Sequence, residues 1–581
     1  MRHTVLAGLV TLALTATSVL AQPQIEGVEL GFNGRFLPGA LTPITLSLRH
    51  SGPAQNFSLE ISQEVRDFAE RSFSEYMRLP LSLAPGARKT ISFDFLIRSV
   101  GTPVRIALLT EDREITHTEI DLRERWSETP LTLGLGTSPV PSLELIDPAK
   151  LPKRWTSYEG VSRVLWGRLD PARLSAEQRL ALLGWLLRGG ELVILAGENW
   201  YEQSSDASLA VETSASGWWA HLVPITNGRV VRREFNGQEV SWLEGDLRSG
   251  ARVIVSAAGR PLVWERPVGS GRVLLVALAT LPDAVKLPER SPDELKAPAE
   301  GDHLIIRALG AQVIPFPARE IIGGLLIAFV IGVAVSGMLA TRWRKVSGGI
   351  ALAAIALAFA LFQYQHSPEF SSEKYSVHLG VLRIWSGEPI AWEQDWYGVF
   401  SRRPHDELLS VTADSVRAVK PAQWAAARPA SDIIVEMVSP QMRALRFHSE
   451  RDSVRFFAAE RMTERVVQFT VNRAVSPPQI HVYNQSSASL RDVVVRIGDD
   501  LYKLGSIAPQ TGLIGPVSKL DRISKAEWLN SLPEGRRMLW HQWGTESVSP
   551  TLIGWFEDGS VWVKTEREAR TVVRLVIAQG D

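Results

Sequence analysis

Between Gly27 and about Arg125, apolar and polar residues alternate with a period of two, which is the pattern of strands with one buried face. Turns that carry glycine and proline, such as 37–40 and 84–87, separate these segments. Several short strands in such a stretch are typical of an immunoglobulin-like β-sandwich, which we assign to 22–126. The apolar positions are Ile44, Leu46 and Leu48; Phe57, Leu59 and Ile61; Ile91, Phe93, Phe95 and Ile97; and Val104, Ile106 and Leu108.

After Pro130 the pattern changes to buried strands that alternate with a helix. The residues 131–136 and 164–166 form apolar runs, and Ser175 with Gln178 makes a capping box before a helix with Leu180, Leu183 and Leu187 on its apolar face. Gly189-Gly190 ends this helix, and the strand 191–195 follows. A hairpin around the turn 268–271 closes the segment. The strand–helix–strand order predicts a parallel α/β sheet, which we assign to 127–315.

Two long apolar runs lie near the middle of the chain. The run 321–340 carries no charge over a length of about 30 Å as a helix, and a second run, 346–364, follows a short basic loop. These runs predict a membrane hairpin with helices at 319–341 and 346–364. Arg342, Arg344 and Lys345 in the loop 342–345 predict that this loop is cytoplasmic.

Small residues recur every four positions in the first predicted span, at Gly324, Ala328, Gly332 and Ser336. Such a stripe allows close helix packing, either against the second span or against a helix of a partner protein.

The residues 1–21 have a basic start, an apolar middle and a small residue at the end, as in a secretory signal peptide. An uncleaved anchor helix is the alternative. With the basic loop, this segment predicts an integral protein of a bacterial inner membrane, with both large flanks in the periplasm. The residues 365–581 carry strand-like runs and predict a mainly-β domain, in which 551–556 and 560–564 form a hairpin.

Composition excludes several classes of function. Lys+Arg and Asp+Glu both number 63, so no net charge favours nucleic acid. The chain has no cysteine, which removes thiolate metal sites and cysteine nucleophiles. No phosphate-binding or zinc motif is found, and the 11 histidines show no ligand spacing. We therefore expect no cofactor, no metal and no catalytic residue, while a small-molecule ligand stays open. The 19 tryptophans, among them Trp392 and Trp396, predict placement in a buried core or at the membrane surface; the alternative is a surface that binds glycan or a protein partner.

The segment "LSAEQRLALLGWLLRGGELVILAG" and the later "PLVWERPVGSGRVLLVAL" resemble the class I glutamine amidotransferase-like (flavodoxin-like) domain of uncharacterised bacterial envelope proteins. That family places an immunoglobulin-like domain before this domain and membrane helices after it, and its genes often lie beside those of MoxR-type ATPases and von Willebrand A-type proteins. The resemblance implies a role in envelope assembly or stress.

Without a cysteine nucleophile, amidotransferase chemistry is excluded. We therefore expect a non-catalytic protein that presents interaction domains to protein partners. The alternative is an envelope hydrolase or transferase with an unrecognised site in the α/β domain.

Overall fold

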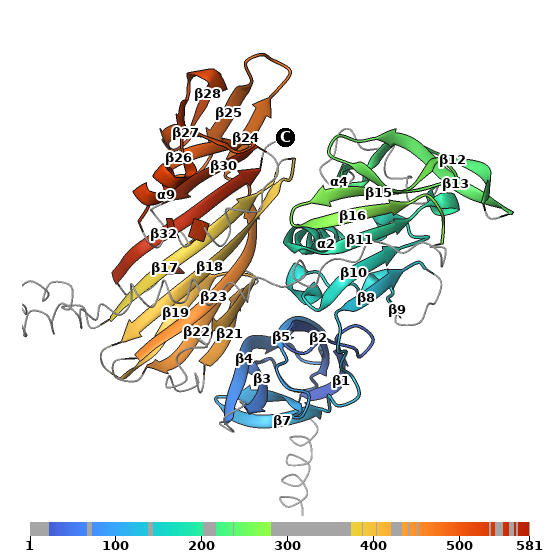
Figure 1. Ribbon diagram of the computed structural model, residues 1–581. Helices are drawn as coiled ribbons and strands as arrows, with labels where there is room; N and C mark the ends of the chain where they lie inside the picture. Colours follow the sequence, from blue (N-terminus) through green and yellow to red (C-terminus); the bar gives the residue numbers. More distant parts are fainter. Residues whose placement is uncertain are drawn as a thin grey trace, which may run out of the picture.

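The fold is taken from a computed structural model of the chain. It describes residues 23–66, 72–137, 143–200, 217–235, 237–280, 374–385, 387–401, 404–419, 433–439, 442–449, 453–533, 536–537, 539–540, 550–556, 563–564 and 568–579. These residues form three β-rich units, coloured blue, cyan to green, and yellow to red in Figure 1. We call them the N-terminal unit (β1–β7), the middle unit (β8–β16) and the C-terminal unit (β17–β32).

The N-terminal unit consists of two sheets around one apolar core. The first sheet has the order β1 (Gln24–Leu30), β2 (Leu41–Arg49), β5 (Arg88–Leu96). The facing strands are β4 (Ser72–Leu83), β3 (Gln55–Arg66), β6 (Val104–Thr110) and β7 (Arg113–Ile120). The predicted alternation is confirmed, because Ile44, Leu59 and Ile106 and their neighbours at a spacing of two lie in this core.

The middle unit is built on a seven-stranded mixed sheet. Its order is β14 (Arg252–Ala257), β15 (Arg260–Val268), β16 (Gly271–Val276), β11 (Glu191–Leu195), β10 (Val161–Trp166), β8 (Leu131–Leu135), β9 (Leu143–Leu145). The helix α2 (Ala176–Arg188) connects the parallel neighbours β10 and β11. The short helix α4 (Gly217–Leu222) and the two-stranded ribbon of β12 (Ile225–Phe235) and β13 (Gln238–Leu247) complete the unit.

The predicted flavodoxin-like α/β fold class is wrong. A doubly wound sheet carries helices on both faces between successive parallel strands. Among the described residues, however, α2 is the only α-helix that joins two parallel neighbours without a further strand between them. The chain from β11 to its parallel neighbour β16 contains α4 but also β12 to β15, and β9 leads to β10 through the 3₁₀ turns Pro148–Lys150 and Trp155–Tyr158 (η2). Strands dominate the described chain, and the α-helices with described bounds are α2, α4 and α9 (Lys525–Ser531).

The C-terminal unit contains a nine-stranded sheet. The order is β20 (Ser415–Val419), β23 (Ser453–Glu464), β18 (Ile390–Ser401), β17 (Lys374–Ile384), β32 (Glu568–Gln579), β30 (Thr551–Phe556), β26 (Leu490–Ile497), β27 (Asp500–Ile507), β29 (Asp521–Ile523). A smaller sheet is formed by β24 (Val467–Asn472), β25 (Gln479–Asn484) and β28 (Thr511–Pro516). The predicted 551–564 hairpin is wrong, because β31 (Val563–Lys564) pairs with β19 (His405–Thr412) and β30 with β26 and β32.

One sheet runs from the C-terminal unit into the N-terminal unit. Its eight strands have the order β31, β19, β22 (Met442–Ser449), β21 (Ile433–Ser439), β4, β3, β6, β7. At the boundary, β21 pairs in parallel with β4, with Ile434 opposite Tyr76 and Glu436 opposite Arg78. The first and last units therefore share backbone hydrogen bonds, and Figure 1 shows β21 beside β4.

The helix α2 packs between the middle sheet and the nine-stranded sheet, as Figure 1 shows. Leu182 and Leu186 of α2 share one core cluster with Trp392 and Trp396 of β18. The tryptophans of β18 are thus buried, as the core interpretation predicts, and the alternative of an aromatic binding surface there is wrong. A single apolar core therefore spans the middle and C-terminal units.

The predicted two-span membrane protein is contradicted. No helix among the residues that the structure describes is both long and apolar enough to cross a bilayer. The longest of the described helices, α2, has 13 residues, or about 20 Å, and packs inside the protein. The predicted inner-membrane location, with both flanks in the periplasm, depends on these spans and is contradicted by the same finding. The signal segment 1–21, the spans 319–341 and 346–364 and the loop 342–345 lie outside the described residues.

Candidate functional site at the junction of three units

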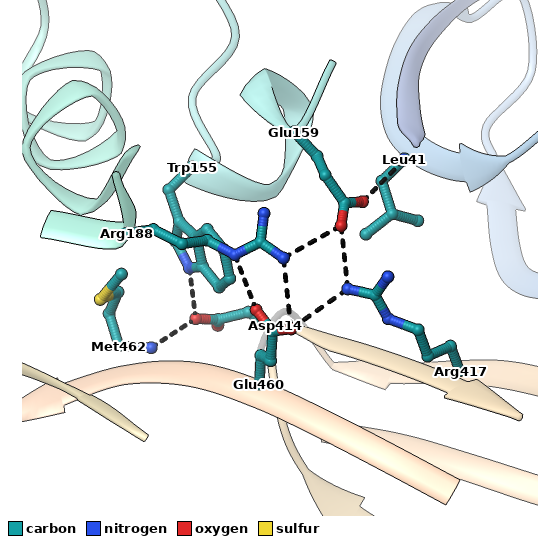
Figure 2. Close-up of polar contacts among 8 residues, drawn as sticks. All are labelled: Leu41, Trp155, Glu159, Arg188, Asp414, Arg417, Glu460 and Met462. Carbon is teal, nitrogen blue, oxygen red and sulfur yellow. Dashed lines mark hydrogen bonds and ion pairs between the residues drawn. The ribbon is translucent and has the colours of Figure 1, made fainter. Parts of the chain in front are cut away.

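Charged side chains from two units meet where all three units come together. Glu159 directly follows η2 in the middle unit, and Arg188 is the last residue of α2. Arg417 and Glu460 lie on the adjacent strands β20 and β23 of the C-terminal unit. We call these four residues the junction cluster; Figure 2 shows them facing one another between the ribbons of the units.

Each carboxylate of the junction cluster contacts both guanidinium groups. Glu159 Oε1 lies 3.0 Å from Arg188 Nη2 and 2.9 Å from Arg417 Nη2. Glu460 Oε2 accepts from Arg188 Nε at 3.0 Å, and Glu460 Oε1 lies 3.1 Å from Arg417 Nη2. The backbone N–H of Leu41 in β2 donates to Glu159 Oε2 at 2.8 Å. This last bond adds the N-terminal unit to the network.

The junction cluster is buried, with side-chain exposures between 2% and 17%. Burial alone would raise the pKa of Glu159, but the charges of Arg417 and Arg188 outweigh it and lower the pKa to about 2. Burial alone would lower the pKa of Arg188, but the negative charges of Glu460 and Glu159 outweigh it and raise this pKa above its usual value. Glu159 and Arg188 are therefore ionised at neutral pH, and removing one member of the cluster would leave its partners buried and unmatched.

Asp414, next to β20, extends the network to neutral donors. Its Oδ2 accepts from Trp155 Nε1 of η2 and from the backbone N–H of Met462, both at 2.8 Å (Figure 2). The guanidinium of Arg188 stacks over the Trp155 ring at 5.4 Å from its centroid. The middle and C-terminal units are thus joined by an aromatic donor as well as by ion pairs.

A cavity of about 80 Å³ adjoins this network. Strands β4, β5, β20, β21 and β22 contribute side chains to its lining, so all of the walls except Arg154 come from the N-terminal and C-terminal units. Arg154, directly before η2, brings in the middle unit. Buried Asp94 accepts from the hydroxyls of Thr156 and Ser157 at 2.5 Å and lies 3.6 Å from Arg154 Nε.

A second buried cluster lies within the nine-stranded sheet, on β17, β18, β23 and β32. Asp395 lies 3.0 Å from His378 Nε2 and 3.2 Å from Arg574 Nη2. Glu393 contacts Arg574 Nη2 at 2.5 Å and accepts from Arg461 Nε at 2.6 Å. The charges of Arg574 and His378 outweigh burial and hold the pKa of Asp395 well below its usual range. Burial raises the pKa of Glu393 to about 7 against the pull of both arginines.

A close backbone approach makes room for this second cluster. Gly380 of β17 is paired with both Asp395 and Arg574, and a Cβ atom at position 380 would lie 2.1 Å from Asp395 Oδ1. His378 stacks on Tyr397 with 4.6 Å between ring centroids. Every one of these side chains is below 10% exposed, so the cluster is a sealed structural ion network rather than a site open to substrate.

Neither cluster was predicted from the sequence. The predicted helix-packing residues Gly324, Ala328, Gly332 and Ser336, and the predicted loop residues Arg342, Arg344 and Lys345, lie outside the described residues. The described part of the chain holds no group of three or more metal-ligating side chains. Charged residues inside strands that are otherwise apolar, such as Glu393 and Asp395 in "IAWEQDWYGVF", are the one sequence signal that points to the second cluster.

Comparison with known proteins gives no family. No family model matches the chain, and no curated protein matches it. An alkylpurine DNA glycosylase of Pseudomonas fluorescens bound to DNA is 18% identical over 18% of this chain and 31% of its own, with a TM-score of 0.15. An exo-β-1,4-mannosidase of an Opitutaceae bacterium is 16% identical over 24% of this chain and 23% of its own, with a TM-score of 0.15.

The yeast δ-COP-I μ-homology domain, in complex with a Dsl1 WxWxV peptide, is 8% identical and covers 36% of this chain and 96% of its own, with a TM-score of 0.21. The chain spans less than a third of the length of the glycosylase and of the mannosidase. Similarities this low carry no argument about fold or function. The resemblance to amidotransferase-like envelope proteins therefore stays a prediction.

Proposed function

We propose that this protein is a non-catalytic scaffold that holds three β-rich units in one arrangement and presents their outer faces to protein partners. The observation that carries the proposal is the junction cluster, in which two carboxylates and two guanidinium groups join residues of the middle and C-terminal units and Leu41 of the N-terminal unit. Buried ion pairs of this kind require one mutual geometry, because any displacement leaves a buried charge unmatched.

Two further features support a fixed arrangement. The pairing of β21 with β4 extends one sheet across two units, and Leu186 of α2 shares a core with Trp396 of β18. Domains joined only by small polar interfaces are expected to move relative to one another, whereas large apolar interfaces hold them in place.

One outer face has the chemistry of a protein contact. On the small sheet of β24, β25 and β28, Ile514 is 71% exposed and lies opposite His481, and Tyr483 is 39% exposed on the same face. Exposed tyrosine and aliphatic side chains within a polar surround are typical of contact surfaces. We call Tyr483 and Ile514 the contact pair.

Cross-linking in cells that naturally produce the protein, followed by affinity purification of the tagged full chain, tests this function. Wild type is expected to capture the same protein partner in replicate experiments, and Tyr483→Ser/Ile514→Asp to capture at least about fivefold less. Leu180→Asp is the matched control, because Leu180 is an exposed leucine on α2, away from the contact pair; it is expected to behave as wild type.

The outcomes separate the two functions. No reproducible partner of the wild type would overturn the scaffold. Labelling of the purified protein by a serine-directed activity probe, abolished by a single serine substitution, would replace the scaffold by a hydrolase. Equal capture of the partner by wild type, Tyr483→Ser/Ile514→Asp and Leu180→Asp would show that the contact pair does not bind the partner.

A further inference from the structure

The small sheet of the C-terminal unit ends at β28, whose outer edge carries no further strand among the described residues (Figure 1). β28 pairs with β25 in an unbroken antiparallel register. Directly after β28, the N–H of Val517 donates to Pro478 O, which lies opposite it. Because bonded and unbonded pairs alternate along an antiparallel ladder, Gly512 and Ile514 direct their N–H and C=O groups away from β25. These groups bond to no residue in the described part of the chain.

The other sheet edges of the described chain carry features that hinder the pairing of a further strand. Three of these edge strands, β9, β29 and β31, have three residues or fewer. The registers of β1, β7 and β14 against their neighbours are shifted, and β12, β13 and β20 carry charged side chains. On β5 and β24, arginine side chains occupy the carbonyls of Ser92 and Val467.

Proteins use such devices to keep sheet edges from pairing with other chains. In contrast, β28 has six residues, no charged side chain and no register shift. Its one unfavourable feature for pairing is Pro516, which stands at its end. The edge of β28 is therefore open to another strand.

Two side chains lie beside this open edge. Ile514 is itself part of β28, and the ring of Tyr483 extends from β25 across Gly512, where a Cβ atom would lie 3.0 Å from Tyr483 Cδ2. The two cross-strand ladders that contain the contact pair carry no lysine, arginine, aspartate or glutamate. Their members are Gln468, Tyr483 and Gly512, and Thr470, His481 and Ile514.

This chemistry specifies the kind of segment that fits. An extended segment beside β28 would bond to the free N–H and C=O groups of Gly512 and Ile514, as in recognition by strand addition. Aliphatic or aromatic side chains are the favourable cross-strand neighbours of Ile514, whereas a charged side chain would find no opposite charge in these two ladders.

We propose that the partner protein binds by adding an extended, uncharged strand to the edge of β28, with aliphatic or aromatic side chains against Ile514 and Tyr483. This inference rests on the scaffold function, because it names the segment that the contact pair recognises. Backbone bonds to β28 hold the segment, and the contact pair selects its side chains.

Hydrogen exchange of the full chain, free and in complex with the partner that the wild type captures, tests strand addition at single amides. In the free chain, the amides of Gly512 and Ile514 are expected to exchange at least about tenfold faster than that of Leu513, which bonds to β25. In the complex, the amides of Gly512 and Ile514 are expected to slow at least about tenfold, while Leu513 changes less than about threefold.

A pair of variants at one position separates the backbone from the side chain. Ile514→Pro and Ile514→Ala both remove the isoleucine side chain, but only proline also removes the outward N–H. We expect Ile514→Ala to lower capture of the partner by up to about threefold, and Ile514→Pro to lower it at least about fivefold further. Slow exchange at Leu513 in Ile514→Pro is the control that β28 is still paired with β25.

The outcomes distinguish this inference from the scaffold function. If the wild type captures no partner, both are overturned. If a partner is captured but the amides of Gly512 and Ile514 exchange equally fast with and without it, or if Ile514→Pro with β28 still paired captures as much as Ile514→Ala, only strand addition is overturned. Protection of these amides that rises with the concentration of the free chain would show that a second copy occupies the edge, which also overturns the proposal.

Discussion

At the scale of single residues, Glu159 contributes more to the junction than any group exposed on the surface. It contacts two guanidinium groups and one backbone N–H while its side chain is 6% exposed. Removing one member of a buried ion network leaves the others desolvated and unmatched, which costs more than the loss of a surface pair.

Glu159→Gln is expected to lower the free energy of unfolding by about 3 kcal/mol at pH 7, because Arg188 and Arg417 lose a shared counter-charge while the bond from Leu41 can persist. Urea denaturation measures the change. The control is Glu29→Gln, since Glu29 pairs with Lys150 at the surface with both side chains more than half exposed. The control is expected to change stability by less than about 1 kcal/mol.

Glu159 also makes the stability of the protein depend on pH. The pKa of Glu159 is depressed in the folded state, from 4.5 to about 2, so its stabilisation is complete above about pH 5 and is lost as the pH falls toward 2. The stability difference between wild type and Glu159→Gln is therefore expected to shrink by most of its value between pH 6 and pH 2.5. A difference that is constant over this range would show that Glu159 does not act through its charge.

Gly380 is the second residue whose replacement tests the structure. Gly380→Ala forces a Cβ against Asp395 Oδ1 inside the second buried cluster and is expected to cost about 2 kcal/mol in urea denaturation. Gly27→Ala is the matched control, because it also lies in a strand and a Cβ there meets no atom within 4 Å. Equal stability of the two variants would contradict the packing described around Asp395.

At the scale of elements, β21 determines how the first and last units are joined. It lies between β22 and β4, so its backbone groups bond on both sides. The bulge at Val438, which is 52% exposed, ends this regular pairing.

Val435→Pro is expected to separate β21 from β4, because proline lacks an N–H and is not tolerated in a central strand. Hydrogen exchange of the amides at Tyr76–Arg78 is expected to become at least about tenfold faster. Val438→Pro, placed in the bulge, is expected to leave this exchange within about threefold of wild type. Slow exchange at 76–78 in Val435→Pro would mean that β4 does not depend on β21.

At the scale of the whole molecule, the shared sheet, shared core and junction cluster couple the units thermodynamically. We expect tryptophan fluorescence and far-ultraviolet circular dichroism of the wild type to report one coincident urea transition. In Glu159→Gln, which removes a charge only at the junction, the two transitions are expected to separate. Non-coincident transitions in the wild type would show that the units unfold independently and would weaken the scaffold proposal.

The sequence alone determined features that depend on neighbouring residues. Alternation predicted the buried faces of β2, β3 and β6, the capping box predicted the start of α2, and the glycine turn predicted the β15–β16 hairpin. These succeed because side-chain period, capping and turn geometry act within a few residues. The prediction that Leu180 lies on the apolar face of the helix does not make it a core residue, since this leucine is 55% exposed near the start of α2.

Only the tertiary structure decided the rest. The pairing of β21 with β4, and the meeting of Arg188 with Glu460, join residues hundreds of positions apart, and no local pattern encodes which distant partner a charged residue or strand edge will find. The same holds for the fold class, because a strand–helix–strand segment is compatible with many sheets and the surrounding strands decide among them. Arg154 and Arg443 read as ordinary surface arginines in the sequence, and long-range packing alone brings them to one cavity.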